Sequence, residues 1–374
     1  MTRHNLFRFK SRSRSLAAML LTILGVSGGA LAQETKPFEP RPDAKEVNAD
    51  RAELGRLLFF DTRLSGDTST SCATCHGPAK GWGDGKALSD GYSSISYFRN
   101  APSLFNVANR NYFMWDARLD GADLGTLVRD MLVEAHTMNM DSRLMQERLK
   151  QVPEYAEMFE KAFGGDPYCG KIYGAIAEYL KTISTQNAPF DAFLAGKADA
   201  ISDSAKRGMD LFAGKAGCTQ CHSGPMLSDG GVHATGAPDH PELQTDANRQ
   251  ISLLRHFSTQ GVPNYMNLRA DVGNYVVTKE KDDIGKFATP SLWDVGQTAP
   301  YMHSGALATL GDVVDFYNAG GGNGANKSAL LKPLDLNDAE KADLVAFLES
   351  LTGDAPDASV PALPDYAMRD VGKN

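Results

Sequence analysis

The chain has 374 residues, a length that favours two domains of ordinary size. Its 46 acidic residues outnumber the 38 Lys and Arg, which gives a formal charge of −8 and makes nucleic acid a poor partner. Beyond the N-terminus no apolar run is long enough to cross a bilayer, so we expect a mature protein without a membrane span.

Residues 1–32 have the three parts of a secretory signal peptide. Basic residues precede an apolar run from Leu16 to Val26, and Ala30-Leu31-Ala32 offers a cleavage site of small residues. The run is too short to span a bilayer, although a retained anchor is the alternative. We therefore expect export to the periplasm. Loss of the five cations in this segment moves the formal charge to −13, which would attract a basic partner such as a small electron carrier.

Residues 33–50 are polar and contain prolines, which predicts a linker. A helix should follow, because Leu54, Leu57 and Leu58 fall on one helical face, and a glycine turn then leads to a pair of cysteines. The same order of helix, glycine turn and cysteine pair recurs from Ser204 to His222. The chain is therefore internally duplicated.

Two C-x-x-C-H motifs identify the cofactor: Cys72-Ala73-Thr74-Cys75-His76 and Cys218-Thr219-Gln220-Cys221-His222. In this motif the two thiols add to the vinyl groups of haem, and the histidine binds the iron. A redox pair or half of a zinc site is the alternative, but no second thiol pair or nearby histidine accompanies either motif. We expect two covalent haems c, with His76 and His222 as iron ligands. Cys169 is left without a partner in the chain.

The duplication predicts a mostly α fold with few short strands, built as two tandem c-type cytochrome domains that each enclose one haem. We place the N-terminal domain at residues 51–190, the C-terminal domain at residues 191–353 and a tail at residues 354–374. The best strand signal is Asn274 to Thr278.

The clearest helix signal lies near the end of the chain. Asn337 and Glu340 have the spacing of a capping box, and an apolar stripe that includes Leu344 and Phe347 follows before Gly353. In small c-type cytochromes such a helix packs across the N-terminal helix. This one should complete the second domain.

The sixth ligand of each iron decides whether a haem transfers electrons or meets a substrate. Between the first motif and Met114 the chain has no His or Met, which favours an open face on the first haem. For the second haem, spacing alone does not choose among His233, His240, His256, Tyr301, Met302, His303 and Tyr317.

From about Leu54 to Gly353 the chain resembles the bacterial dihaem cytochrome c peroxidases and the related MauG-type enzymes. In such enzymes peroxide reacts at the N-terminal haem, and the C-terminal haem stores or relays electrons. The resemblance is carried by Leu54-Gly55-Arg56-Leu57-Leu58-Phe59, Arg99-Asn100-Ala101-Pro102-Ser103-Leu104-Phe105-Asn106, Trp115-Asp116, Thr298-Ala299-Pro300-Tyr301-Met302-His303-Ser304-Gly305 and Phe347-Leu348-Glu349-Ser350-Leu351-Thr352-Gly353.

The resemblance implies roles for individual residues. Trp115 corresponds to a tryptophan that passes charge between the haems, although by itself it would be read as a core aromatic. Asn100, Thr298 and Pro300 correspond to ligands of a calcium ion. Tyr317 corresponds to the second haem's ligand, which is methionine in the ordinary peroxidases and tyrosine in the MauG-type enzymes. A phenolate ligand stabilises ferric iron.

Three positions bear on the type of enzyme. The stretch from Tyr92 to Tyr97 lacks the histidine that blocks the first haem of ordinary peroxidases. Thr137 replaces the glutamate expected above that haem, so Glu134 or His136 could supply the general acid and base. Trp293 stands where the family usually has arginine.

The sequence therefore predicts a periplasmic dihaem peroxidase with an open N-terminal haem and a tyrosine-ligated C-terminal haem. Hydrogen peroxide would be its substrate. Electrons would come from a small electron-carrier protein or from a protein substrate that is oxidised. The alternative is a dihaem electron-transfer cytochrome without peroxide chemistry, in which His136 or another side chain closes the first haem.

Overall fold

The computed structural model describes residues 37–92, 95–324, 326–357 and 359–366. The predicted signal peptide and the last residues of the predicted tail lie outside these ranges. None of the described helices has the length and apolar character of a membrane span.

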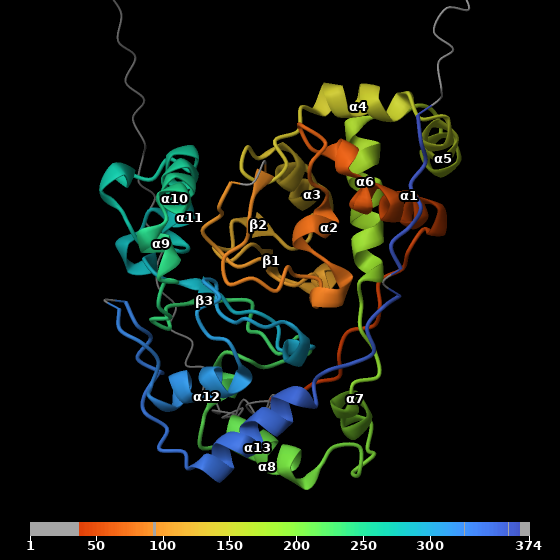
Figure 1. Cartoon of the computed structure of the whole chain (residues 1–374). Helices are drawn as coiled ribbons and strands as arrows, with labels where there is room; N and C mark the ends of the chain where they lie inside the picture. The colour runs from red at the N-terminus through yellow and green to blue at the C-terminus, as the bar shows by residue number, and fades with distance from the viewer. Residues whose placement is uncertain (1–36, 93–94, 325, 358, 367–374) are drawn as a thin grey trace, which may run out of the picture. The chain divides into compact units, whose positions relative to one another are not determined.

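The described chain is mostly helical, as the sequence predicts, and its strands are two residues long (Figure 1). Strands β1 (Tyr112–Phe113) and β2 (Leu119–Asp120) form one antiparallel pair, and β3 (Val232–His233) and β4 (Phe287–Ala288) form another. The helices are α1 (Ala49–Phe60), α2 (Cys72–Cys75), α3 (Leu124–Val133), α4 (Ser142–Lys150), α5 (Pro153–Phe163), α6 (Cys169–Thr182), α7 (Pro189–Leu194), α8 (Asp203–Ala213), α9 (Glu242–Thr245), α10 (Ala247–Thr259), α11 (Tyr275–Thr278), α12 (Leu310–Asn318) and α13 (Asp338–Glu349).

The predicted strand from Asn274 to Thr278 is wrong, because this segment forms helix α11. The carbonyl of Asn274 accepts from the backbone N–H groups of Val277 and Thr278, which closes a helical turn. The Asn274 side chain is also committed, since its Nδ2 donates to the carbonyl of Asp116 at 2.7 Å. The β-branched residues that suggested a strand have no partner strand here, and tertiary contacts outweigh their propensity.

The segment predicted as a linker, residues 33–50, also differs from expectation. Helix α1 begins within it, at Ala49. The ring of Phe38 packs edge-on against Phe190 and Phe347, with centroid distances of 5.5 and 5.7 Å. Arg41 forms an ion pair with Asp191 at 2.7 Å. These contacts tie the segment to α7 and α13, which sequence reasoning missed because two isolated side chains give no periodic pattern.

Buried hydrophobic side chains form three clusters. The first draws on residues 54–183 and the second on residues 188–351. The third combines Leu88 and Phe98 with side chains from residues 243–276. The change from the first cluster to the second falls close to the domain boundary that the sequence predicts at residue 190.

Two helix pairs repeat the same crossing. Helix α1 packs against α6, and α8 packs against α13 (Figure 1). A Cβ atom on Gly55 would lie 1.9 Å from the carbonyl oxygen of Ala175, and one on Gly208 would lie 1.9 Å from that of Asp343. Only glycine permits such an approach of two helix backbones. The predicted packing of the C-terminal helix on the helix before the second motif is confirmed.

Aromatic side chains repeat beside these glycines. Phe59 and Phe212 each lie four residues after the glycine of their helix. The ring of Phe59 meets Tyr179 edge to face at 5.3 Å, and the ring of Phe212 meets Phe347 edge to face at 5.2 Å. The two copies therefore share the packing of their crossings as well as their order in the chain.

A loop is also repeated, and its copies touch. Pro102-Ser103-Leu104-Phe105-Asn106 in the first half matches Pro290-Ser291-Leu292-Trp293-Asp294 in the second. Asn106 and Asp294 both have left-handed backbones, with φ of 54° and 65°, and a short 3-10 helix follows each. Nδ2 of Asn106 donates to Oδ2 of Asp294 at 3.0 Å.

The backbone between the halves follows the same approximate two-fold relation. The N–H of Asn100 donates to the carbonyl of His303 at 2.8 Å, and that of Ala288 donates to the carbonyl of Trp115 at 2.9 Å. Each donor lies two residues before the proline of its loop, and each acceptor follows a methionine with positive φ. Trp115 and His303 thus occupy equivalent places in the two halves.

Candidate haem sites

The two motif histidines are oriented by the same kind of contact. Nδ1 of His76 lies 3.1 Å from the carbonyl oxygen of Trp82, and Nδ1 of His222 lies 3.0 Å from that of Leu227. Burial lowers the pKa of both imidazoles, which favours the neutral form that binds iron. Donation from Nδ1 to a carbonyl fixes the tautomer and leaves the Nε2 lone pair free for a metal.

A cavity of about 280 Å³ opens beside the second motif. Cys218, Cys221 and His222 line it, and Tyr317 reaches it from α12. Burial, with the two cysteines nearby, raises the pKa of the Tyr317 hydroxyl. That hydroxyl forms no hydrogen bond with any residue in the described part of the chain. The structure therefore brings the motif histidine and the predicted tyrosine ligand to one cavity.

Five of the seven residues considered as ligands of the second haem line this cavity, and His240 and His256 do not. Among the five, the hydroxyl of Tyr301 donates to the carbonyl of Val295 at 3.0 Å. The ring of His303 stacks on Phe287, with centroids 3.6 Å apart. The hydroxyl of Tyr301 is thus used in a hydrogen bond to the protein, and stacking holds the imidazole ring of His303. The other lining residues of the set are His233, Met302 and Tyr317.

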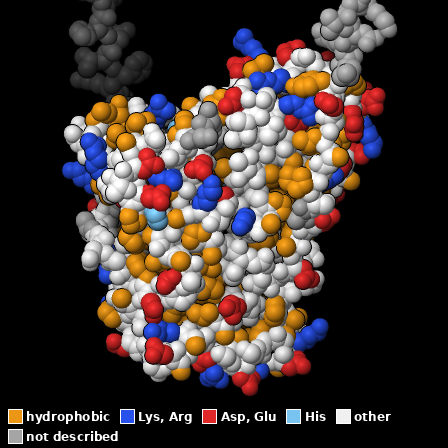
Figure 2. Space-filling model, in the orientation of Figure 1, with side chains coloured by type: hydrophobic (Ala, Val, Ile, Leu, Met, Phe, Trp, Pro, Cys, Tyr) orange, Lys and Arg blue, Asp and Glu red, His pale blue; other side chains and the backbone are white. Residues whose placement is uncertain are grey.

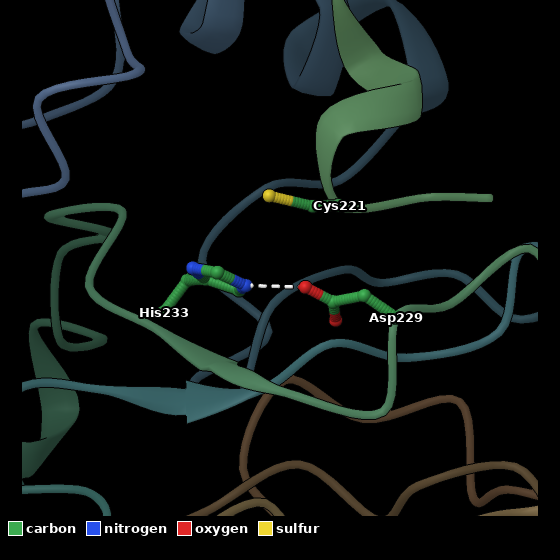
Figure 3. A group of neighbouring side chains, drawn as sticks. All are labelled: Cys221, Asp229 and His233. Atoms are coloured by element: carbon green, nitrogen blue, oxygen red, sulfur yellow. Dashed lines mark hydrogen bonds and ion pairs between the residues drawn. The ribbon is translucent and has the colours of Figure 1, made fainter. Parts of the chain in front are cut away.

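The competitor His233 is held by Asp229. Its Nε2 lies 2.7 Å from Oδ2 of Asp229, and Figure 3 shows the two side chains pointing toward each other below the sulfur of Cys221. One ligand atom from each of the three residues lies within 4.8 Å of the others, as a metal ion would require. Attachment of haem converts the Cys221 thiol to a thioether, so the set loses its thiolate ligand and we assign no metal to it.

The surroundings of Arg110 indicate whether this cavity suits a haem. Its guanidinium is buried at the cavity wall and donates to the carbonyls of Ser103 and Phe105 at 2.6 and 3.1 Å. Burial lowers its pKa to about 10, so the group stays cationic at neutral pH. No carboxylate of the described residues pairs with it, and its Nε has no hydrogen-bond partner there. A buried cation is costly without a counter-ion, which a haem carboxylate would supply. The residues fit the cofactor.

Trp115 lies at the wall of the same cavity. Its Nε1 donates to the carbonyl of Asn100 at 3.0 Å. Pro102 of the same loop also lines the cavity, and its carbonyl faces the imidazole of His76. The loop of residues 100–103, to which Trp115 is hydrogen-bonded, therefore runs between the first motif and the second cavity. That Trp115 passes charge stays a prediction.

The three predicted calcium ligands, Asn100, Thr298 and Pro300, line this cavity together. Nδ2 of Asn100 donates to the carbonyl of Lys86 at 2.8 Å, and Oγ1 of Thr298 donates to the carbonyl of Val295 at 3.2 Å. The structure brings them together, and their binding of calcium stays a prediction.

Glu134 and His136, the predicted acid and base, lie beside the first motif. Met138 of the same segment places its sulfur 4.0 Å from that of Cys72. The carbonyl of His136 accepts from the backbone N–H of Tyr92 at 3.2 Å. His136 is buried, and its Nε2 lies 3.8 Å from Oε2 of Glu134. Burial lowers the pKa of His136, so the imidazole is neutral at pH 7 and able to accept a proton.

Trp293 lines the cavity of the second motif, and its Nε1 donates to the carbonyl of Pro225 at 2.9 Å. Arg41 stacks on it, with Cζ 4.0 Å from the ring centroid. A guanidinium from the N-terminal segment thus stacks on the ring at position 293, although Arg41 itself does not line the cavity. Sequence reasoning missed Arg41 because the contact joins residues far apart in the chain.

Cys169 forms no disulfide within the described chain. Its sulfur accepts from Nε2 of Gln146 at 3.0 Å and lies 3.6 Å from the carbonyl of Ser142. These hydrogen-bond contacts assign the thiol no chemical role.

Comparisons with known proteins agree on the family. The model of the di-haem cytochrome c peroxidase family matches residues 49–199. The chain is 54% identical to cytochrome-c peroxidase IdrP2 of Denitromonas iodatirespirans over 100% of both chains. It is 35% identical to methylamine utilization protein MauG of Methylorubrum extorquens, over 87% of this chain and 84% of that one.

The fold agrees as well. The crystal structure of a MauG-like protein associated with microbial copper homeostasis superposes with a TM-score of 0.70, at 28% identity, over 87% of this chain and 96% of that one. Family membership implies two haems c, which accounts for both cysteine motifs. The chain belongs to the di-haem cytochrome c peroxidase family and is a haem-dependent peroxidase.

Proposed function

We propose that this protein is a periplasmic peroxidase of the MauG type, in which hydrogen peroxide reacts at the haem of His76 and electrons pass through the haem of His222. The observation that carries the proposal is the cavity shared by His222 and Tyr317. A tyrosine ligand favours oxidised iron, which suits a haem that shares an oxidising equivalent rather than one kept reduced.

Two tandem haem domains, at residues 51–190 and 191–353, are part of this proposal. The repeated glycine crossings and the repeated Pro-Ser-Leu loops support it, because each copy accompanies one C-x-x-C-H motif. Calcium bound by Asn100, Thr298 and Pro300 would join the two domains, since these residues come from both.

At the first site the bound haem supplies the redox chemistry. The protein moves the protons. Reduction of one peroxide to two waters breaks the O–O bond and consumes two electrons and two protons. His136 accepts a proton from the peroxide oxygen that will stay behind and donates it to the oxygen that departs as water, while Glu134 holds the imidazole in place.

At the second site Tyr317 and His222 would hold the cofactor, and Arg110 would supply a counter-charge for one of its carboxylates. Trp115 provides an aromatic step between the two sites, and its hydrogen bond to the carbonyl of Asn100 fixes the indole there. Passage of charge between the sites would then need no mobile carrier.

The electron source is a protein, either a small carrier or a protein substrate that is oxidised in the process. The net acidic charge would favour a basic partner. On the face drawn in Figure 2, acidic and basic side chains are interspersed, so that face offers no patch of one sign.

The test is to mix the purified ferric holoprotein with one equivalent of hydrogen peroxide and to follow both haems by absorption and electron paramagnetic resonance. We expect one high-spin and one low-spin ferric signal, which both decay on mixing without prior reduction. Two low-spin signals that peroxide leaves unchanged would instead indicate an electron-transfer cytochrome, with His136 as the group that closes the first haem.

A further inference from the structure

A cluster of buried charged side chains joins the third hydrophobic cluster to the first half of the chain. Arg99 pairs with Asp116 at 2.6 Å and with Asp271 at 2.5 Å. Arg118 pairs with Asp116 at 3.1 Å and with Glu134 at 3.2 Å. Two arginines therefore face three carboxylates, and the cluster has one negative charge in excess.

Two histidines touch this cluster. His256 of α10 is 1% exposed, and its Nε2 lies 3.4 Å from Oδ2 of Asp116. Neither of its ring nitrogens has a hydrogen-bond partner within the described chain. The ring of His136, which contacts Glu134, has its centroid 6.4 Å from that of His256. A chain of ion pairs through Asp116, Arg118 and Glu134 thus connects the two imidazoles.

One protonated histidine would cancel the excess negative charge and leave the cluster neutral. A second proton would place two cations next to each other in a site with little solvent, which is unfavourable. Burial lowers the pKa of both imidazoles, and a carboxylate opposes this for each, Asp116 for His256 and Glu134 for His136. A positive charge on His256 lowers the pKa of His136 further. The two imidazoles therefore compete for one proton.

We propose that His256 is a positioning residue, which competes with His136 for the one proton that the buried cluster holds and thereby helps to keep His136 neutral and able to accept a proton from peroxide. This inference rests on the proposed function, because it assumes that His136 is the base. His256 would act without touching the substrate.

The surroundings of both imidazoles are consistent with this competition. Aromatic rings cover His256, with Phe98 and Phe257 at centroid distances of 5.2 and 6.2 Å. Tyr97 lies 5.8 Å from His136, and its buried hydroxyl, whose pKa burial raises, stays neutral. The charged groups that face the two histidines are Arg99, Asp116 and Arg118 for His256, and Arg118, Glu134 and Arg255 for His136.

The test uses carbon monoxide bound to the reduced holoprotein, because its C–O stretching frequency reports the charge near the first haem. In the wild type this frequency should change with pH as His136 takes up a proton. In His256→Gln the midpoint should move to higher pH by at least about half a unit, since the opposing positive charge is gone. In His256→Lys an ammonium beside Asp116 should move the midpoint below that of the wild type, in which His256 carries a proton only part of the time.

His240→Gln is the matched control, because His240 lines neither the cavity nor the cluster, and its midpoint should equal that of the wild type. The acid limb of the rate of reaction with peroxide should shift by the same amount as the infrared midpoint. Unchanged midpoints in both His256 variants would overturn the inference and leave the peroxidase proposal standing. A transition that persists in His136→Gln would overturn both the assignment of the base and the inference.

Discussion

Tyr317 is the side chain on which the type of peroxidase depends. Its hydroxyl is buried with a raised pKa, so it keeps its proton unless a cation such as ferric iron is bound to the oxygen. The Tyr317→Phe variant should lose the low-spin ferric signal of the second haem and its absorption bands. The measurement is electron paramagnetic resonance of the ferric protein.

Tyr301→Phe is the control for this variant, since Tyr301 lines the same cavity but donates its hydroxyl to the carbonyl of Val295. Its spectrum should match that of the wild type. If the spectrum of Tyr317→Phe also matches the wild type, the ligand is another residue of the cavity wall, such as Met302 or His303.

Trp115 is expected to pass charge between the two sites. Trp115→Phe keeps an aromatic ring but loses the hydrogen bond to Asn100 and the more easily oxidised indole. Peroxide should still react at the first haem, whereas the response of the second haem should slow by about tenfold or more, equivalent to at least about 1.4 kcal/mol of barrier. Stopped-flow absorption at wavelengths specific to each haem measures both rates, and equal rates for variant and wild type would exclude Trp115 from the path.

At the scale of single residues, a role could be predicted from the sequence only where the residue belongs to a motif that forms covalent bonds. The C-x-x-C-H histidines could be assigned because their chemistry is local, and the structure adds the carbonyls that orient them. Arg110 and Arg41 were missed, because an isolated arginine shows its function only through the cavity or ring that it faces.

The helix crossings make Gly55 and Gly208 positions where each half tolerates little change. A Cβ at either position would overlap a carbonyl oxygen of the partner helix. Gly55→Ala and Gly208→Ala should each lower the free energy of unfolding by about 3 kcal/mol, since the helices would have to separate. Urea denaturation of the holoprotein measures the loss.

Gly174→Ala in α6 provides the comparison. Its Cβ would meet only the ring of Phe163 at 3.7 Å, an ordinary contact, so this variant should be as stable as the wild type or gain up to about 1 kcal/mol. Equal stability of all three variants would contradict the proposed tight crossing.

Helices were predicted well where the sequence contains both a capping motif and an apolar stripe. The capping box at Asn337 and Glu340 is present, and the helix begins at Asp338 as expected. The strand predicted from Asn274 to Thr278 is wrong because β-branched residues form a strand only if another strand is available to pair with them. The repeat of the Pro-Ser-Leu loop is visible in the sequence, but only the structure shows that its two copies are in contact.

Across the whole molecule, Arg99 with Asp271 connects the segment around α10 to the first half. Burial raises the pKa of Asp271, but Arg99 lowers it more, so the folded protein holds this carboxylate with a reduced pKa. The pair therefore stabilises the fold above the unfolded pKa of about 3.9 and loses this effect as the pH falls through the lower folded value.

Asp271→Asn should cost about 3 kcal/mol at pH 7, because it leaves Arg99 with one carboxylate fewer. The difference in Tm between variant and wild type should stay constant from pH 7 down to about pH 4 and should shrink below that, as the pH falls through the unfolded pKa toward the folded one. Asp203→Asn, which removes an exposed carboxylate on α8, should change Tm little at any pH. A difference in Tm that does not vary with pH would show that Asp271 acts through packing alone.

The sequence by itself determined the two haem attachment sites, the helical class and the duplication, because these depend on covalent chemistry and on patterns within a few turns of chain. Only the tertiary structure decided which histidine belongs to which site. His256 lies near the second motif in sequence, yet packing of α10 places it against Asp116 and His136. Tyr317 is instead brought to the cavity of His222. Contacts of this kind are set by packing between distant segments, and spacing along the chain does not encode them.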